Sequence, residues 1–270
     1  MGFQEKVNLK FKGSPRTAYK ESDLKPHRIR YWLNAKPDPD FDARCADVCD
    51  VYAKAQERAK AGICSVSIDE MTGIQALQRI APDIPMKPGR VLRREYEYIR
   101  HGTQCLIAAF DIATGSVKGT LSDRRTEEDL TAFLETLITS QSPQTKWEIV
   151  TDNLNTHLSE GLVRLVARHC DIDIELGKKG KKGILKTRFT RQQFLCDKSH
   201  RITFHFTPKH ASWLNQIEIW FSILVRKVIR RGNFSSRQDL KVKIETFIEY
   251  FNKTMAKPFK WTYQGKPLAI

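Results

Sequence analysis

The stretch QCLIAAFDIATGSVKGTL, residues 104–121, contains two β-rich runs with a turn between them. The runs cover residues 104–111 and 117–121, and the Ala-Thr-Gly-Ser sequence that joins them is typical of a hairpin. Earlier in the chain, the run CSVSID predicts a short strand over residues 64–69 that ends at Asp69, before a turn. We therefore expect three consecutive antiparallel strands.

Helical and strand patterns alternate after this hairpin. Three acidic residues follow Thr126, where they favour the start of a helix, and WEIVT and ITFHF are typical of buried strands. Ser212 can cap a further, long helix that ends in Arg-Arg-Gly. The expected helices cover residues 41–60, 126–140, 158–170, 213–231 and 238–252, and the expected later strands cover residues 147–151 and 202–206.

Three antiparallel strands followed by alternating helices and strands predict an α/β fold, in which a mixed five-stranded sheet is flanked by helices. This order of elements is the one found in ribonuclease H-like nucleases. Side chains that follow the carboxyl ends of strands in such a sheet are exposed at its edge, where a ligand can reach them.

Three carboxylates stand at such positions. Asp69 closes the first strand, Asp152 follows WEIVT, and Glu218 lies about one and a half turns into the helix predicted over residues 213–231. Carboxylates that are brought together repel one another unless a cation neutralises them. Oxygen ligands of this kind suit two Mg²⁺ or Mn²⁺ ions, which can activate a nucleophile and stabilise a leaving oxygen on phosphorus.

Three polar residues near these carboxylates are secondary candidates. Asn153 and His157 belong to the motif TDNLNTH that contains Asp152, and Asn215 lies three residues before Glu218, on the same side of the predicted helix. A single histidine at a helix start is more often structural than catalytic, so His157 is placed below the carboxylates.

Positive charge is concentrated in two stretches of the chain. The formal net charge is +15, of which residues 1–33 contribute +5 and residues 176–201 contribute +8. Clustered charge of this kind indicates binding to a polyanion, with nucleic acid favoured over an anionic membrane. The candidate DNA-binding residues of the second stretch are Lys178, Lys179, Lys181, Lys182, Lys186, Arg188 and Arg191.

Neither a membrane span nor a secretion signal is predicted. The longest purely apolar run, residues 105–110, is too short to cross a bilayer, so we expect a cytoplasmic, nucleoid-associated protein with no membrane partner. The six cysteines are then expected to be reduced. Cys196, His200 and His205 lie close together, but their spacing matches no usual zinc pattern, so we predict no structural zinc site.

Four motifs resemble the insertion sequence 630 transposase family, the bacterial branch of the mariner superfamily. They are SIDEMTGIQAL (67–77), RREYEYIRHGTQ (93–104), TDNLNTH (151–157) and TPKHASWLNQIEIWFSILVRK (207–227). The resemblance implies that Asp69, rather than the adjacent Glu70, joins Asp152 and Glu218 in a catalytic, metal-binding Asp-Asp-Glu triad. It also implies cleavage of transposon ends and strand transfer into target DNA, at TA sites, by a homodimer bound to two DNA ends.

The chain departs from that family in two respects. Asp152 and Glu218 are separated by 65 residues, about twice the spacing in simpler members, and we interpret the basic stretch 176–201 as an insertion that contacts DNA. Residues 1–40 resemble a basic linker, the remnant of an N-terminal helix-turn-helix region. We expect a catalytic domain over residues 41–232 and a C-terminal helical extension over residues 233–270.

Two other functions stay open on the sequence alone. A ribonuclease H-type or Holliday-junction nuclease would share the fold and the metal ions. A catalytically silent, DNA-binding remnant of a transposase would keep the carboxylates without acting on DNA ends.

Overall fold

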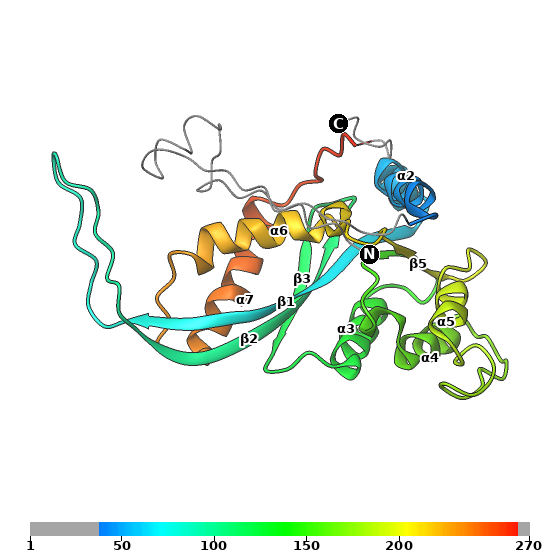
Figure 1. Ribbon diagram of the computed structural model, residues 1–270. Helices are drawn as coiled ribbons and strands as arrows, with labels where there is room; N and C mark the ends of the chain where they lie inside the picture. Colours follow the sequence, from blue (N-terminus) through cyan, green and yellow to red (C-terminus); the bar gives the residue numbers. More distant parts are fainter. Residues whose placement is uncertain (1–37, 264–270) are drawn as a thin grey trace, which may run out of the picture. The chain divides into compact units, whose positions relative to one another are not determined.

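The computed structural model describes residues 38–263 and is built around one five-stranded sheet (Figure 1). The strand order is β3-β2-β1-β4-β5, with β1 antiparallel to β2, β2 antiparallel to β3, and β1, β4 and β5 mutually parallel. This topology confirms the predicted ribonuclease H-like mixed sheet. The strands are β1 (Ile63–Arg79), β2 (Tyr98–Asp111), β3 (Val117–Ser122), β4 (Lys146–Thr151) and β5 (Ile202–Phe206).

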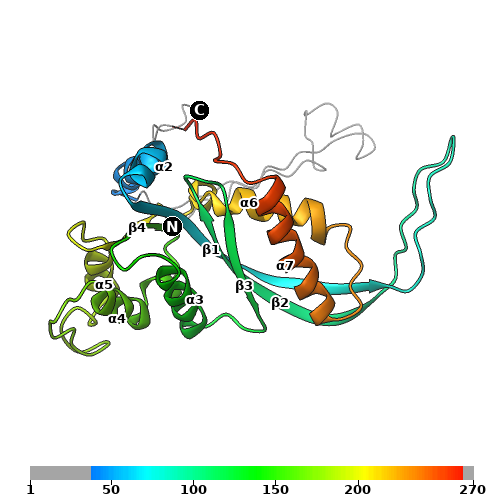
Figure 2. The same cartoon turned by 180° about the vertical axis from the view of Figure 1, so that it is seen from behind.

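Helices cover both faces of the sheet (Figures 1 and 2). Successive side chains of a strand point to opposite faces, so Leu106 and Phe110 of β2 pack into one core while Ile107 and Ala109 pack into the other. One face carries α3 (Glu127–Thr139), α4 (Glu160–His169) and α5 (Arg188–Leu195), and the other carries α2 (Phe41–Lys60), α6 (Ile217–Leu224) and α7 (Arg237–Thr254). Burial on both faces explains why the apolar run of β2 is continuous.

Local capping signals account for several helix starts. The Thr126 side chain accepts a hydrogen bond from the Asp129 main chain and the Asp129 side chain accepts one from Thr126, which is a capping box. Ser159 and Ser236 cap α4 and α7 in the simpler way, through one side-chain acceptor each. The helices predicted over residues 41–60, 126–140 and 238–252 are confirmed to within two residues, and the 158–170 helix begins after a short 3₁₀ turn, Thr156–Leu158.

The prediction that the first strand ends at Asp69 is wrong. β1 continues to Arg79 and pairs with β2 along this length, with an irregularity between Met71 and Ile74. Gly73 lies there with φ of 68°, so a bulge stands where the strand was expected to give way to a turn. The two long strands extend as a hairpin beyond the rest of the sheet (Figure 1).

The prediction of one long helix over residues 213–231 is also wrong. Ser212–Leu214 is a 3₁₀ turn, Asn215 is extended with ψ of 110°, α6 begins at Ile217, and a π-helix follows over Val225–Ile229. Ser212 lies inside the 3₁₀ turn and does not occupy the capping position of α6, which is Gln216. The break exists because Asn215 bonds to β1 instead: its amide donates to the Ile68 carbonyl at 3.0 Å and its oxygen accepts from Ser67.

The basic stretch 176–201, interpreted from the sequence as an insertion, contains a helix of its own. It contains α5, which starts at a capping box formed by Thr187 and Thr190, and Leu185 and Leu195 are buried in the core. The stretch is therefore attached to the body of the fold by apolar packing, and only part of it can act as a free surface.

The predicted linker over residues 1–40 lies almost entirely outside the described residues. α7 packs through Leu240, Ile244 and Phe251 into the same core as α6. The boundary between a catalytic domain and a C-terminal extension at residue 232 stays a prediction. The six cysteines are free, and no helix among the described residues is long and apolar enough to cross a membrane.

Candidate active site

Asp69 and Asp152 lie at the same level of two neighbouring parallel strands. Ser67 of β1 pairs with Val150 of β4, so Asp69, two residues further on, is level with Asp152, which directly follows β4. Asp69 is 7% exposed, whereas the Asp152 side chain is 30% exposed. The pair thus presents one buried and one accessible carboxylate at the end of β4.

Glu218 approaches this pair from the first turn of α6, not from one and a half turns into a helix as predicted. Burial, followed by the nearby charge of Asp152, raises the pKa of Glu218. The same two causes raise the pKa of Asp69 to about 7. Asp152 is therefore close enough to both Asp69 and Glu218 for its charge to raise their pKa values.

Asn215 fixes the buried member of this group. Its amide nitrogen lies 3.2 Å from Asp69 Oδ2, and the side chain is fully buried. Ser67, which the sequence analysis did not single out, accepts a hydrogen bond from the Ile217 main chain at 2.9 Å. Tyr52 of α2 donates to the Leu214 carbonyl at 2.7 Å. These long-range bonds hold the 3₁₀ turn and the start of α6 against β1 and α2.

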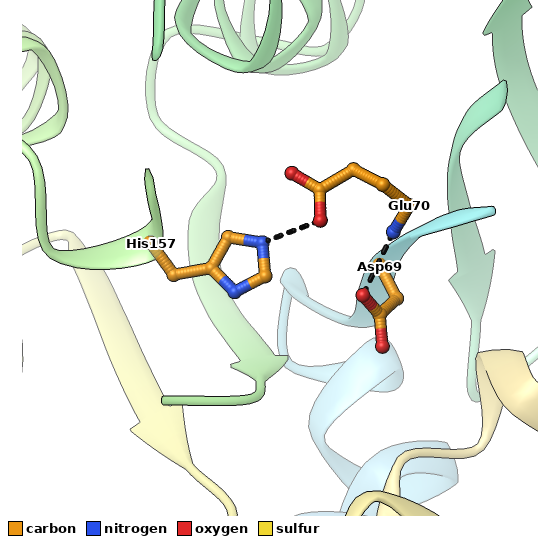
Figure 3. A group of neighbouring side chains, drawn as sticks. All are labelled: Asp69, Glu70 and His157. Atoms are coloured by element: carbon orange, nitrogen blue, oxygen red, sulfur yellow. Dashed lines mark hydrogen bonds and ion pairs between the residues drawn. The ribbon is translucent and has the colours of Figure 1, made fainter. Parts of the chain in front are cut away.

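His157 contacts two carboxylates within the fold. Its Nδ1 lies 2.6 Å from Asp152 Oδ1. On the other edge of the ring, its Nε2 lies 3.2 Å from Glu70 Oε2 (Figure 3). Burial alone would lower the pKa of His157, but its contacts with the carboxylates of Asp152 and Glu70 outweigh the effect of burial and raise the pKa to about 10. The sequence does not predict a role for Glu70, whose signal is its position next to Asp69 on a strand.

Asn153 ties the loop after β4 to neighbouring elements. Its side-chain amide donates to the Thr207 carbonyl, its oxygen lies 3.3 Å from Gln192 Nε2, and its main-chain carbonyl accepts from Arg188. None of these contacts involves the three carboxylates. Asn153 therefore links Asp152 to α5 and to the segment after β5.

The candidate DNA-binding residues do not form one uniform surface. Arg191 is half-buried and donates to the carbonyls of Leu158 and Leu185, at 2.6 and 2.9 Å. Two of the lysines pair with acids, Lys179 with Glu127 and Lys182 with Glu175. The exposed members are Lys178, Lys179, Lys181, Lys182, Lys186 and Arg188.

The donor set fits a divalent cation. Burial and repulsion by the charge of Asp152 raise the pKa values of Asp69 and Glu218, and a bound cation would relieve this repulsion. Asp69, Glu70 and His157 also offer one ligand atom each within 4.8 Å of one another. Carboxylate oxygens are the ligands that Mg²⁺ and Mn²⁺ prefer.

Comparison with known proteins gave matches to one sequence family and to several solved structures. The family, described as DDE superfamily endonuclease, matches residues 65–241. A comparison with curated proteins gave no match. The Mos1 mariner paired end complex with Mn is 10% identical at a TM-score of 0.47, and the match covers 87% of this chain and 62% of that one. For the catalytic domain of Mos1 mariner transposase, the identity is 9%, the TM-score 0.45 and the coverage 81% and 85%.

Proposed function

The chain belongs to the DDE superfamily endonuclease family, and from that premise we propose that it is a transposase that cuts transposon ends and transfers them into target DNA, at TA sites. The observation that carries the proposal is that Asp152, directly after β4, is close enough to Asp69 of β1 and to Glu218 of α6 for its charge to raise the pKa of each. The motifs that resemble insertion sequence 630 transposases support transposon ends as the substrate.

We propose that Asp69, Asp152 and Glu218 bind the divalent ions. Such ions, when bound, activate a nucleophile and stabilise the leaving oxygen of the phosphodiester. Asp152 and Glu218 are half-buried. Asn215 and the Glu70 main-chain amide, 2.8 Å from Asp69 Oδ1, orient the buried carboxylate of Asp69. Rigid placement of charge of this kind is the protein's main contribution to phosphoryl transfer.

DNA would reach these carboxylates across the basic stretch. Arg188 is bonded to the Asn153 carbonyl, one residue from Asp152, so the start of α5 lies beside the site. Exposed lysines of the same stretch, Lys186 among them, would contact backbone phosphates and position the scissile bond. A dimer that holds two transposon ends is part of the proposal.

The test is nicking of supercoiled plasmid DNA by the purified chain. We expect nicking that requires Mg²⁺ or Mn²⁺, and losses of about a hundredfold or more for Asp152→Asn and Glu218→Gln, because each removes a charged ligand. DNA affinity, measured by fluorescence anisotropy, should stay within about threefold. Near-normal nicking by Glu218→Gln would contradict the assignment, and preferential cleavage of RNA–DNA hybrids or four-way junctions would point to another nuclease of this fold.

A further inference from the structure

Glu70 is a carboxylate buried without a hydrogen bond. It follows Asp69 on β1, its side chain is 0% exposed, and neither oxygen accepts a hydrogen bond from a described residue. Its charged neighbour is His157, whose Nε2 lies 3.2 Å from Oε2 (Figure 3). An uncompensated buried carboxylate is strongly destabilising, so Glu70 depends on this contact.

The other edge of the His157 ring holds Asp152. Nδ1 lies 2.6 Å from Asp152 Oδ1, and the Leu154 main-chain amide donates to the same oxygen at 2.9 Å. No described residue donates a hydrogen bond to Asp152 Oδ2. One carboxylate oxygen is thus held by two donors, and the other is left for a ligand.

We propose that Glu70 and His157 act as a positioning pair for Asp152, in which Glu70 holds the ring, Nδ1 fixes Oδ1, and Oδ2 remains to bind a divalent ion. The inference rests on the proposed function, in which Asp152 is a metal ligand. Residues that hydrogen-bond to a metal ligand orient that ligand, and their loss commonly weakens metal binding by about 10–100-fold. Glu70 and His157 are therefore positioning residues and do not contact the DNA.

Direct ligation of an ion by Glu70 and His157 is the competing explanation, since both lie within 4.8 Å of Asp69. Burial argues against it. Both side chains are closed to solvent, whereas a catalytic ion needs open coordination positions and Asp152 is 30% exposed. Each ring nitrogen of His157 also already faces a carboxylate, which leaves neither one directed at an empty site.

Two double variants separate these explanations. Glu70→Gln with His157→Asn keeps an amide donor at the place of Nδ1, beside Asp152, whereas Glu70→Gln with His157→Gln moves that donor to the place of Nε2. Both variants remove the same ionisable groups. Mn²⁺ affinity is measured without DNA, by electron paramagnetic resonance of the free ion, and thermal unfolding is measured in EDTA.

We expect the Asn variant to bind Mn²⁺ within about threefold of wild type and the Gln variant to bind about tenfold or more weakly. Their melting temperatures in EDTA should be alike. If Nδ1 had a purely structural role, the Gln variant would instead melt at a lower temperature than the Asn variant. Equal Mn²⁺ affinities for the two variants, whether both normal or both reduced, would overturn the proposal.

Asp152→Asn tests the proposed function separately. If it binds Mn²⁺ as tightly as wild type, or if wild type binds none, then the proposed metal site falls and the positioning role falls with it. If wild type binds Mn²⁺ and the two double variants differ as expected, but no DNA is nicked, then the proposed function fails and the positioning role stands.

A measurement on the wild-type protein covers the case in which the variants do not fold. In protein labelled with ¹⁵N-histidine, we expect the His157 Nδ1 proton to persist at saturating Mg²⁺, because Nδ1 donates to Asp152. Loss of that proton on Mg²⁺ addition would identify His157 as a ligand and overturn the proposal.

Discussion

Asp69 lies in the middle of a paired strand, where burial and then the charge of Asp152 raise its pKa to about 7. The pKa values of Glu218 and His157 are raised as well. A group whose pKa is raised on folding stabilises the fold below its unfolded pKa, and this contribution is lost as the pH rises through the folded value. Loss of a proton from each of these three groups therefore lowers the stability of the fold as the pH rises above about 4.

We expect the metal-free protein to lose stability between pH 5.5 and pH 8, and Mg²⁺ to raise the melting temperature more at pH 8 than at pH 5.5. Asp69 must lose its proton as the pH passes about 7, and a bound cation compensates the resulting charge. At this chain length, a change of 1 kcal/mol in the free energy of unfolding corresponds to about 2–4 °C. Differential scanning fluorimetry in EDTA and in Mg²⁺ measures both effects.

Asp69→Asn serves as the control for this pH dependence, because its side chain cannot ionise. The variant should show a flatter melting temperature between the same two pH values. An unchanged slope would mean that other groups, and not Asp69, set the pH dependence.

Turns and breaks between elements decide how the site is assembled. Gly115, in the β2–β3 turn, has φ of 78°, and a Cβ placed on it would lie 2.1 Å from the Lys257 carbonyl oxygen. The turn thus packs directly against the segment that follows α7. Gly180, in the basic stretch, has nearly the same φ, 75°, but a Cβ there would meet nothing within 4 Å.

Gly115→Ala should therefore destabilise the protein far more than Gly180→Ala. The left-handed backbone costs each alanine about 1–2 kcal/mol, and only at residue 115 does the main chain of Lys257 also have to move. We expect a loss of more than about 3 kcal/mol for Gly115→Ala and about 1 kcal/mol for Gly180→Ala, measured by urea unfolding. Equal losses would show that the turn does not depend on this close contact.

Charge is unevenly placed over the molecule as a whole. The exposed lysines of the basic stretch adjoin α5, on the face of the sheet that carries α3 and α4, whereas α7 covers the opposite face (Figure 2). Phosphate contacts release counterions, so their number sets the salt dependence of DNA binding.

Replacing Lys178, Lys179, Lys181 and Lys182 by Gln should weaken DNA binding similarly for different sequences. The slope of log K against log salt should fall by up to about 0.9 for each lost phosphate contact. A matched variant that neutralises the exposed Lys60, Lys253, Lys257 and Lys260, which lie in and after α2 and α7, loses the same charge. Equal slopes for the two variants would assign the basic stretch to solubility instead of DNA contact.

Local pattern and capping chemistry alone determine much of this fold. The helix over residues 41–60 and the strand over residues 202–206 were predicted to the residue, and the Thr126 helix to within one, since apolar periodicity and caps act within a few residues. The apolar pattern of WEIVT likewise predicts that Asp152 directly follows a buried strand, as it does in the structure.

The tertiary structure decided what the hairpin sequence 104–121 could not: how far its partner β1 runs, and which side chains meet beside Asp69. β1 continues past Gly73 because β2 is there to pair with it. Asn215 leaves the helical pattern because bonds to β1, 147 residues away, replace those of the helix. Glu70 is buried because His157 lies opposite its carboxylate. Such pairings depend on partners that are distant in sequence, and no local pattern encodes them.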